Sequence, residues 1–415
     1  DQIDISLKKL LKIRFRLGMF DPPSQVPYAN IPQSVLECRP HQEQALKMAR
    51  QSMVLLKNDR NLLPLSRKYR KIALIGPNAH NETTQLGNYN GIPSNNVTLL
   101  EALQQEKGIE VVYDAVSDFT RPNKDADLEH LADRYKDVDL IIYAGGISPL
   151  LEGEEGDAGG AEGFIGGDRT TIQLPAVQTE VMKRLSRLNK PMVFVCMSGS
   201  AIACNWESEN IPAIIQAWYG GQAAGTALAD ILFGRYNPSG KLPVTFYRSD
   251  ADLPPFEDYS MSNRTYRYFK GDVLYPFGYG LSYTSFKYSK LQCPQEMQIG
   301  DSLTVSVEVK NTGKRTGEDV VQLYLSHKAI APEAPICQLV RFQKVTLQPG
   351  ERKTVVFKLS THDLAYVDDC GNTNTAPGTV TVYAGNVCPS APGRFTSRIL
   401  SSPVKLKGGT KCFFY

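Results

Sequence analysis

Between residues 71 and 233, short apolar runs alternate with amphipathic segments. The apolar runs show no polar alternation, which is typical of strands buried on both faces of a sheet. The predicted strands are Lys71–Gly76, Ile109–Tyr113, Val138–Ala144, Met192–Met197 and Ala213–Ala217, and the predicted helices are His41–Lys57, the segment LLEALQQ after Thr98, Asp125–Tyr135, Val177–Leu188 and Ala223–Phe233. This order predicts an α/β domain with a largely parallel sheet covered by helices on both faces.

From Tyr283 onward the period of the pattern changes to two. The segments SLTVSVEVKNTG, DVVQLYLSH, KTVVFKLS and GTVTVYAG each alternate apolar and polar residues, as half-buried antiparallel strands do. Asn311-Thr312-Gly313 and Pro349-Gly350 supply turns between them. About seven such strands in this length predict a β-sandwich of the immunoglobulin or fibronectin type III kind.

The pattern divides the chain into four parts. Residues 1–37 begin with an amphipathic helix, which Asp21-Pro22-Pro23 must end, followed by an extended stretch with no core of its own. Residues 38–250 are the α/β domain, and residues 282–415 are the β-sandwich. Between them, residues 251–281 are rich in aromatic side chains, and we expect this linker to lie over protein surfaces, because so many exposed aromatics would aggregate.

A loop dense in glycine and carboxylates follows the strand Val138–Ala144. Its acidic residues are Glu152, Glu154, Glu155, Asp157, Glu162 and Asp168. Open α/β sheets place ligands at the carboxyl ends of their strands, where this loop begins. Three interpretations fit: a solvated loop without chemistry, a calcium loop, which the missing EF-hand order disfavours, and a loop that presents a catalytic acid to a sugar. Composition alone does not choose among them.

Composition excludes some classes of partner and cofactor. The net charge of +3 is small for 415 residues and gives no reason to expect nucleic acid, and no apolar run has the length of a membrane span. None of the eight cysteines forms a CxxC pair, so no zinc site is expected. Cys196, inside an apolar strand, is predicted to be a buried thiol, and the last five cysteines could include a disulfide.

Several motifs spread over almost the whole chain resemble glycoside hydrolase family 3. They are ARQSMVLLKNDRNLLPL, IALIGPNA, GKLPVTF and YPFGYGLSYTSF. Members of that family have an N-terminal (β/α)8 barrel, then an α/β sandwich and often a fibronectin-type module. The chain resembles the last two parts. Its opening segment, ending in KIRFRLGMFD, is similar to the end of the barrel domain, so the resemblance implies that residues 1–37 complete a barrel that is absent from this sequence. Without the resemblance, the opening helix could equally pack on the next domain.

Within the family, GNYNG and the loop leading to GGDRTTIQLPAVQ resemble the β-xylosidase branch more than the β-glucosidase branch. The resemblance implies an exo-acting β-xylosidase that removes xylose from the non-reducing end of short xylo-oligosaccharides, or a β-glucosidase. The alternative of another class is a non-catalytic carbohydrate-binding or scaffold fragment. Substrates would be oligosaccharides or aryl glycosides, with no cofactor or metal, and the location would be secreted or periplasmic. Trp218 and Tyr219 could line a sugar site or simply pack.

The resemblance also implies retaining hydrolysis by two carboxyl groups about 5–5.5 Å apart. The nucleophile is an Asp of the barrel, and a Glu of the α/β domain is the general acid/base. Glu152 in LLEGEE occupies the matching position, and Glu154 is the alternative because the local glutamates allow a two-residue slip. Glu155 and Glu162 come next. Asp168-Arg169 is expected to anchor the loop through an ion pair.

Overall fold

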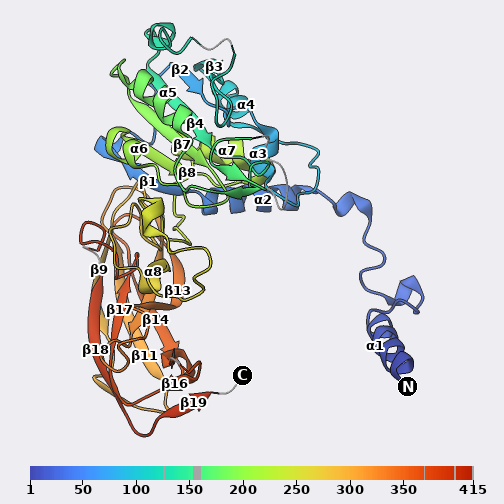
Figure 1. Cartoon of the computed structure of the whole chain (residues 1–415), viewed down its shortest axis with the longest axis vertical. Coiled ribbons are helices and arrows are strands. Elements are labelled where there is room, and N and C mark those ends of the chain that lie inside the picture. The colour runs from blue at the N-terminus through green and yellow to red at the C-terminus, as the bar shows by residue number, and fades with distance from the viewer. Residues whose placement is uncertain (125–126, 153–159, 369, 397–398, 414–415) are drawn as a thin grey trace. The chain divides into compact units, whose positions relative to one another are not determined.

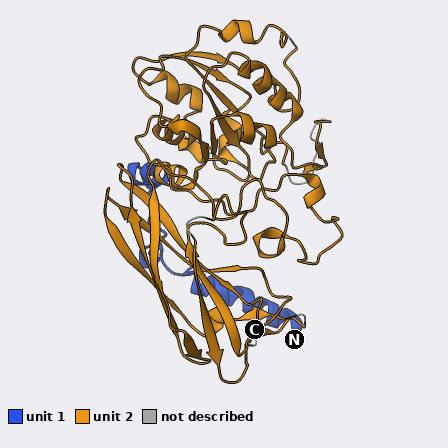
Figure 2. Cartoon of the chain, turned by 90° about the vertical axis from the view of Figure 1, so that its left-hand side faces the viewer, with its two compact units in different colours: residues 1–45 blue, residues 46–415 orange. Residues whose placement is uncertain are grey.

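The computed structural model describes residues 1–124, 127–152, 160–368, 370–396 and 399–413. The chain forms two compact units, Asp1–Ala45 and Leu46–Tyr415 (Figure 2). In the first unit, helix α1 (Gln2–Arg16) begins with a capping box. The side chain of Asp1 accepts from the backbone of the first turn, and the side chain of Asp4 accepts from the backbone nitrogen of Asp1. None of its side chains is buried. The helix ends at Arg16, before Asp21, as predicted.

The second unit begins with an α/β domain whose sheet has six strands among the described residues. The strands, in order across the sheet, are β1 (Val54–Asn58), β8 (Ala213–Gln216), β7 (Met192–Met197), β4 (Leu140–Gly146), β2 (Lys71–Ile75) and β3 (Glu110–Asp114). All neighbours are parallel except β1 and β8. The predicted parallel sheet is confirmed, and an antiparallel edge strand is added to it.

Helices cover both faces of this sheet, as predicted (Figure 1). The helices of the domain are α2 (Arg39–Ser52), α3 (Glu82–Leu86), α4 (Leu99–Gln104), α5 (Ala176–Ser186), α6 (Asn205–Asn210) and α7 (Ala224–Leu232). On one face, α5 packs Val181 and Leu185 against strand residues such as Tyr143. On the other face, α4 and α7 contribute Leu103 and Leu228. The central strands β4 and β7 are therefore buried on both sides, which explains their unbroken apolar runs.

Two predicted helices were wrong in part. The helix expected over His41–Lys57 ends at Ser52, and its last residues belong to β1. Val54, Leu55 and Leu56 are all buried and face both sides of the sheet, which a helix with one apolar stripe does not allow. The expected helix Asp125–Tyr135 is a single 3-10 turn, Ala132–Tyr135, in the described part of that segment.

The reason for the second error lies in the side chain of Asp127. Its carboxylate accepts hydrogen bonds from the backbone N–H groups of Glu129 and His130, at 3.0 and 3.1 Å, and contacts the His130 ring. Such local bonds offer the backbone an alternative to helical pairing. Residues 125 and 126 lie outside the described part of the chain.

The linker 251–281 packs by ring stacking, with one short helix, α8 (Thr265–Tyr268). Tyr266 stacks on Phe277 with ring centroids 4.1 Å apart, and Tyr275 stacks on Tyr279 at 5.9 Å. The expectation that its aromatics are covered fails at Phe256 and Tyr259, which are each 87% exposed.

The C-terminal part is a β-sandwich, as predicted. Its larger sheet contains, in order, β10 (Glu296–Gln298), β18 (Leu400–Lys407), β17 (Gly378–Gly385), β12 (Gly317–Ser326) and β13 (Gln338–Leu347), and the smaller one β14 (Arg352–Leu359), β11 (Leu303–Asn311) and β9 (Phe286–Gln292). Alternate residues of both sheets, such as Val307 on β11 and Leu323 on β12, meet in one core. Short pairings remain outside it: β15 (Tyr366–Val367), β16 (Thr373–Thr375) and β19 (Lys411–Phe413), and the hairpin of β5 (Phe164–Ile165) with β6 (Asp168–Arg169).

Buried polar contacts join the sandwich to the α/β domain. Lys241 pairs with Asp319 at 2.9 Å, and the Asp319 side chain is 1% exposed. Tyr236 donates to Glu318 at 2.9 Å. These contacts attach the α/β domain to strand β12 of the sandwich. Among the helices that the structure describes, none is long and apolar enough to cross a membrane.

Candidate functional site

The loops that follow three neighbouring strands converge at the carboxyl edge of the α/β sheet. Glu152 follows β4, Gly199 and Ser200 follow β7, and Tyr219 follows β8. The turn that carries Glu152 is closed by its own backbone, whose N–H donates to Ser148 O at 3.2 Å. Because parallel strands end at the same edge, residues far apart in sequence meet here, as expected for a ligand site in an open α/β sheet.

The carboxylate of Glu152 accepts hydrogen bonds from neutral donors. Tyr219 Oη donates to Oε2 at 2.7 Å, and the Gly199 backbone N–H reaches the same oxygen at 3.3 Å. Ser200 Oγ donates to Oε1. These donors fix the carboxylate on the sheet edge while its side chain remains only half-buried. A carboxyl group that is held but reachable can exchange a proton with a bound molecule.

The backbone around this carboxylate is closely packed. Asn88 Nδ2 donates to the backbone oxygen of Glu152 at 3.1 Å. A Cβ added at Gly199 would lie 2.9 Å from the Tyr219 ring and 3.2 Å from Glu152 Oε2. Glycine at position 199 therefore allows its N–H to approach the carboxylate.

A positive charge lies near Glu152 on Arg169. Its Nη1 donates to Ser200 Oγ and to the Ala201 carbonyl, each at 2.8 Å, and its Nε donates to Thr171 O at 3.1 Å. Its Nη2 is buried without a hydrogen-bond partner among the described residues. Burial lowers the pKa of the guanidinium, while the charge of Glu152 acts in the opposite direction. Arg169 therefore anchors its loop, although through neutral oxygens rather than the expected ion pair.

Tyr219 is a permanent hydrogen-bond donor at this site. Burial raises the pKa of its phenol, and the charge of Glu152 and the hydrogen bond to it raise the pKa further. The phenol therefore keeps its proton throughout the physiological pH range and donates it in the hydrogen bond to Glu152 Oε2.

A cavity of about 470 Å³ lies beside Glu152. Arg169, Ser200, Tyr247, Asp250 and Leu253 contribute to its lining. Asp250 closes one wall, because its carboxylate accepts from Thr171 Oγ1 at 2.8 Å and from the Ile172 N–H at 2.6 Å. The cavity thus combines an acid, fixed polar groups and apolar surface, as small-molecule sites do.

The other acidic residues of the loop are either outside the described residues or exposed. Glu154, Glu155 and Asp157 lie outside the described residues, so the alternative to Glu152 stays a prediction. Glu162 and Asp168 are exposed.

Of the two aromatics after β8, only Tyr219 reaches the acid. Trp218 packs edge to face on Phe246, with centroids 6.2 Å apart, and donates to Ser52 O at 3.1 Å. Sequence reasoning missed Gly199, Ser200 and Asn88. The signal available for the first two was their place directly after a buried strand, MVFVCM, parallel to the one before the acidic loop.

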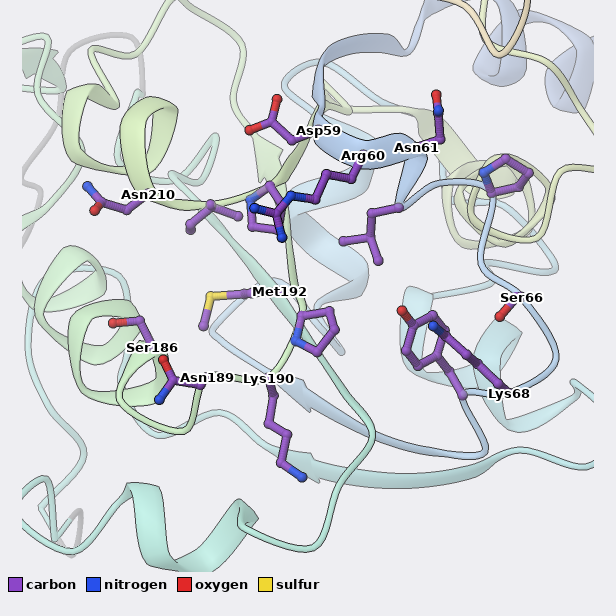
Figure 3. A pocket seen from close by; sticks show the side chains of 16 residues that line it. Asp59, Arg60, Asn61, Ser66, Lys68, Ser186, Asn189, Lys190, Met192 and Asn210 are labelled. Carbon is purple, nitrogen blue, oxygen red and sulfur yellow. The ribbon is translucent and has the colours of Figure 1, made fainter.

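A second cavity, of about 640 Å³, opens at the opposite edge of the sheet, near the amino ends of β7 and β8 (Figure 3). Arg60, Lys68 and Lys190 extend around it, with Asp59 the carboxylate that lines it. Asp59 lies 3.2 Å from Lys57 Nζ, so it is already paired. This cavity lies away from the carboxylate of Glu152, and we assign it no part in the chemistry of that edge.

In the described part of the chain, no group of three or more His, Cys, Asp or Glu side chains is placed to hold a metal ion. Cys196 is 2% exposed, and burial raises the pKa of its thiol to about 12. The predicted buried thiol is confirmed.

Comparison with protein families finds two matches. A family described as the glycosyl hydrolase family 3 C-terminal domain matches residues 53–283, and a fibronectin type III-like domain matches residues 319–387. The first match covers most of the α/β domain and the whole linker. The second lies within the β-sandwich.

Known proteins are similar over nearly the whole chain. A xylan 1,4-beta-xylosidase of Xylanibacter ruminicola is 33% identical over 92% of this chain and 61% of the relative, and a periplasmic beta-glucosidase of Salmonella typhimurium is 34% identical over 92% and 53%. The crystal structure of a beta-glucosidase from Listeria innocua in complex with glucose has a TM-score of 0.80 at 27% identity, covering 96% of this chain and 54% of that one. The chain thus spans between half and two thirds of the length of these relatives.

Proposed function

This chain belongs to glycosyl hydrolase family 3, and we propose that it forms the acid/base-bearing part of a retaining, exo-acting β-glycosidase. Glu152 is the general acid/base. The nucleophilic Asp belongs to a barrel domain outside residues 1–415, to which residues 1–37 connect. The single observation that carries the proposal is the Glu152 carboxylate, held by Tyr219 and Ser200 beside a cavity at the carboxyl edge of the sheet.

In the first step the Asp attacks the anomeric carbon while protonated Glu152 gives its proton to the leaving glycosidic oxygen. In the second step Glu152, now a carboxylate, removes a proton from the water that hydrolyses the glycosyl–enzyme intermediate. The donors of Tyr219 and Gly199 converge on Oε2. They stabilise the ionised state that the second step requires, and the remaining contact, from Ser200, can reorient as Oε1 gains and loses its proton.

The substrate we propose is a short β-linked xylo-oligosaccharide, cleaved at its non-reducing end. Relatives named β-xylosidases, such as that of Xylanibacter ruminicola, support this choice, together with the GNYNG segment that supplies Asn88. A β-glucosidase is the second candidate, because relatives of similar identity carry that name. The name of the Salmonella typhimurium relative supports a periplasmic or secreted location.

The decisive experiment changes Glu152→Ala in the full-length enzyme. Turnover of xylosides with poor leaving groups should fall by about 10²–10⁴, the usual contribution of a general acid. Activated aryl xylosides should lose less in glycosylation, because their leaving group departs without a proton. Added azide needs no general base, so it should restore turnover and yield the β-xylosyl azide.

Glu154→Ala is the matched control. If it produces the azide-rescued pattern and Glu152→Ala does not, the acid/base is Glu154 and the retaining mechanism stands. If neither variant does, the acid lies elsewhere. Parallel assays with aryl glucosides separate the two substrate candidates, and a full-length protein that hydrolyses neither glycoside would favour the carbohydrate-binding or scaffold role.

A further inference from the structure

Two cysteines of the β-sandwich face one another in its interior. Cys337 Sγ lies 3.6 Å from Cys388 Sγ, and each residue is 1% exposed. Cys337 directly precedes β13, and Cys388 follows the end of β17 by three residues. The two positions are 51 residues apart in sequence, so the fold itself brings the sulfurs together.

The surroundings hold the two sulfurs in place. Ser390 Oγ lies 2.7 Å from Cys388 Sγ and 3.7 Å from Cys337 Sγ, and it donates to Tyr266 O at 3.0 Å. Phe277, stacked on Tyr266, packs against the same cluster. The pair therefore lies where the aromatic linker covers the sandwich.

The other cysteines do not share this arrangement. Cys370 and Cys412 are exposed, and Cys196 and Cys204 are buried in the α/β domain, where burial raises the pKa of both thiols. A zinc ion would need about four ligands, and the described residues around Cys337 and Cys388 offer no further thiolate, imidazole or carboxylate cluster. A covalent bond between the two sulfurs is the remaining chemistry of the pair.

We propose that Cys337 and Cys388 form a disulfide bond when the protein folds in an oxidising compartment. A disulfide has sulfurs about 2.05 Å apart, so closing the bond needs a shift of about 1.5 Å, within reach of small side-chain rotations. The oxidant is a disulfide compound such as glutathione disulfide. One protein thiolate attacks glutathione disulfide, forms a mixed disulfide and releases one glutathione thiolate. The second protein thiolate attacks the protein sulfur of that mixed disulfide and releases the other glutathione thiolate. In total, two electrons pass from the cysteines to the oxidant.

The two thiols share a hydrogen-bond contact. Burial would raise the pKa of the Cys388 thiol, but its contacts with the Cys337 thiol and with Ser390 outweigh burial and lower it. The pKa of Cys337 is raised, chiefly because its proton is shared with Cys388. The bond would tie the start of the edge strand β13 to the chain beyond β17, on the two sides of β12.

The test folds the chain with glutathione disulfide and, separately, with a dithiol reductant, alkylates free thiols and maps the peptides by mass spectrometry. The expected product in the oxidised sample is a peptide pair joined through Cys337 and Cys388, two hydrogens lighter than its parts. Because the bond closes a loop of about 50 residues, the unfolding temperature should be roughly 5–10 °C higher in the oxidised sample.

Cys388→Ala should abolish this difference between oxidised and reduced samples, whereas Cys412→Ala should retain it. Peptide mapping of the parent chain needs no variant, so a variant that folds poorly does not obscure the answer. The proposal is overturned if Cys337 and Cys388 are both alkylated as free thiols after folding with glutathione disulfide. It is equally overturned if either is found joined to Cys293, Cys370 or Cys412.

Discussion

Two carboxylates of the α/β domain, Glu152 and Asp230, differ in the charge of the groups that hold them: neutral donors hold Glu152, and arginines hold Asp230. Asp230, on α7, is 4% exposed and lies between two arginines: Arg50 Nε reaches its Oδ2 at 2.7 Å and Arg235 Nε its Oδ1 at 2.5 Å. Glu152 is half-buried beside a cavity, and in the described part of the chain its carboxylate oxygens accept only from the neutral donors Tyr219, Ser200 and Gly199.

The difference separates a carboxylate built into an ion network from one that lies beside a cavity. Asp230 shares two guanidinium groups with a structural network that also includes Glu106, bonded to Arg235 at 2.6 Å. In the described part of the chain Glu152 has no direct ion pair, and Arg169 reaches it through Ser200. The first arrangement serves stability, whereas the second leaves the carboxylate open to the cavity.

The largest effect on stability should follow Asp230→Ala. The change leaves Arg50 and Arg235 facing one another without their shared anion. We expect a loss of roughly 2–4 kcal/mol in the free energy of unfolding, below the full penalty for a buried pair because both guanidinium groups reach solvent. Urea unfolding of the variant and of Glu209→Ala, an exposed carboxylate in the same domain, measures it.

Activity per folded molecule should be unchanged in Asp230→Ala. The distinction between the two carboxylates would be removed if Asp230→Ala were as stable as Glu209→Ala. It would also be removed if the folded molecules of Asp230→Ala lost turnover. In that case the arginines would not be the reason for the buried position of Asp230.

The next effect concerns activity. Tyr219→Phe removes the 2.7 Å hydrogen bond to Glu152 Oε2 and leaves the ring in place. In the full-length enzyme we expect kcat to fall by about ten- to a hundredfold, with a smaller change in KM and about 1 kcal/mol or less lost in stability. Tyr236→Phe is the matched control, because its hydroxyl donates to Glu318 at 2.9 Å in a contact with the β-sandwich. Equal kcat values for the two variants would reduce Tyr219 to a packing role.

Residue patterns predicted the layers of this molecule better than the contacts at its edges. The buried strands β4 and β7 were evident from VDLIIYA and MVFVCM, because burial on both faces leaves a continuous apolar run. The failures occurred where local and tertiary effects compete, as at β1, whose apolar residues also fit a helix until its pairing with β8 is known.

For the candidate site, the sequence pointed to Glu152 but not to the side chains that hold it. Glu152 stands out by its loop and by a family resemblance. Its donors come from the ends of other strands, so Tyr219 and Ser200 carry no local sign of their partner, which lies 67 and 48 residues away. Asp230 and Arg50 are separated by 180 residues. Hydrophobic periodicity determines which face of a strand is buried, but it does not determine which polar side chains meet at its end.

The smallest effect tests a third carboxylate, which combines a neutral partner with full burial. Glu207, on α6, is 1% exposed and accepts from Thr179 Oγ1 at 2.6 Å. Burial raises the pKa of its carboxyl above the ordinary value of 4.5, and the hydrogen bond from Thr179 and the charge of Lys183 offset only part of this. Because the folded state holds this proton more tightly than the unfolded state, the stabilisation is complete below about pH 4.5 and is lost as pH rises through the folded-state pKa.

Glu207→Gln should therefore melt close to the parent at pH 4 and on the order of a few degrees higher at pH 8. Glu209→Gln, on the same helix but exposed, should show no such trend. A constant difference between parent and Glu207→Gln across this range would mean that Glu207 titrates alike in both states, and that a neutral donor is enough to hold a fully buried carboxylate in its charged form.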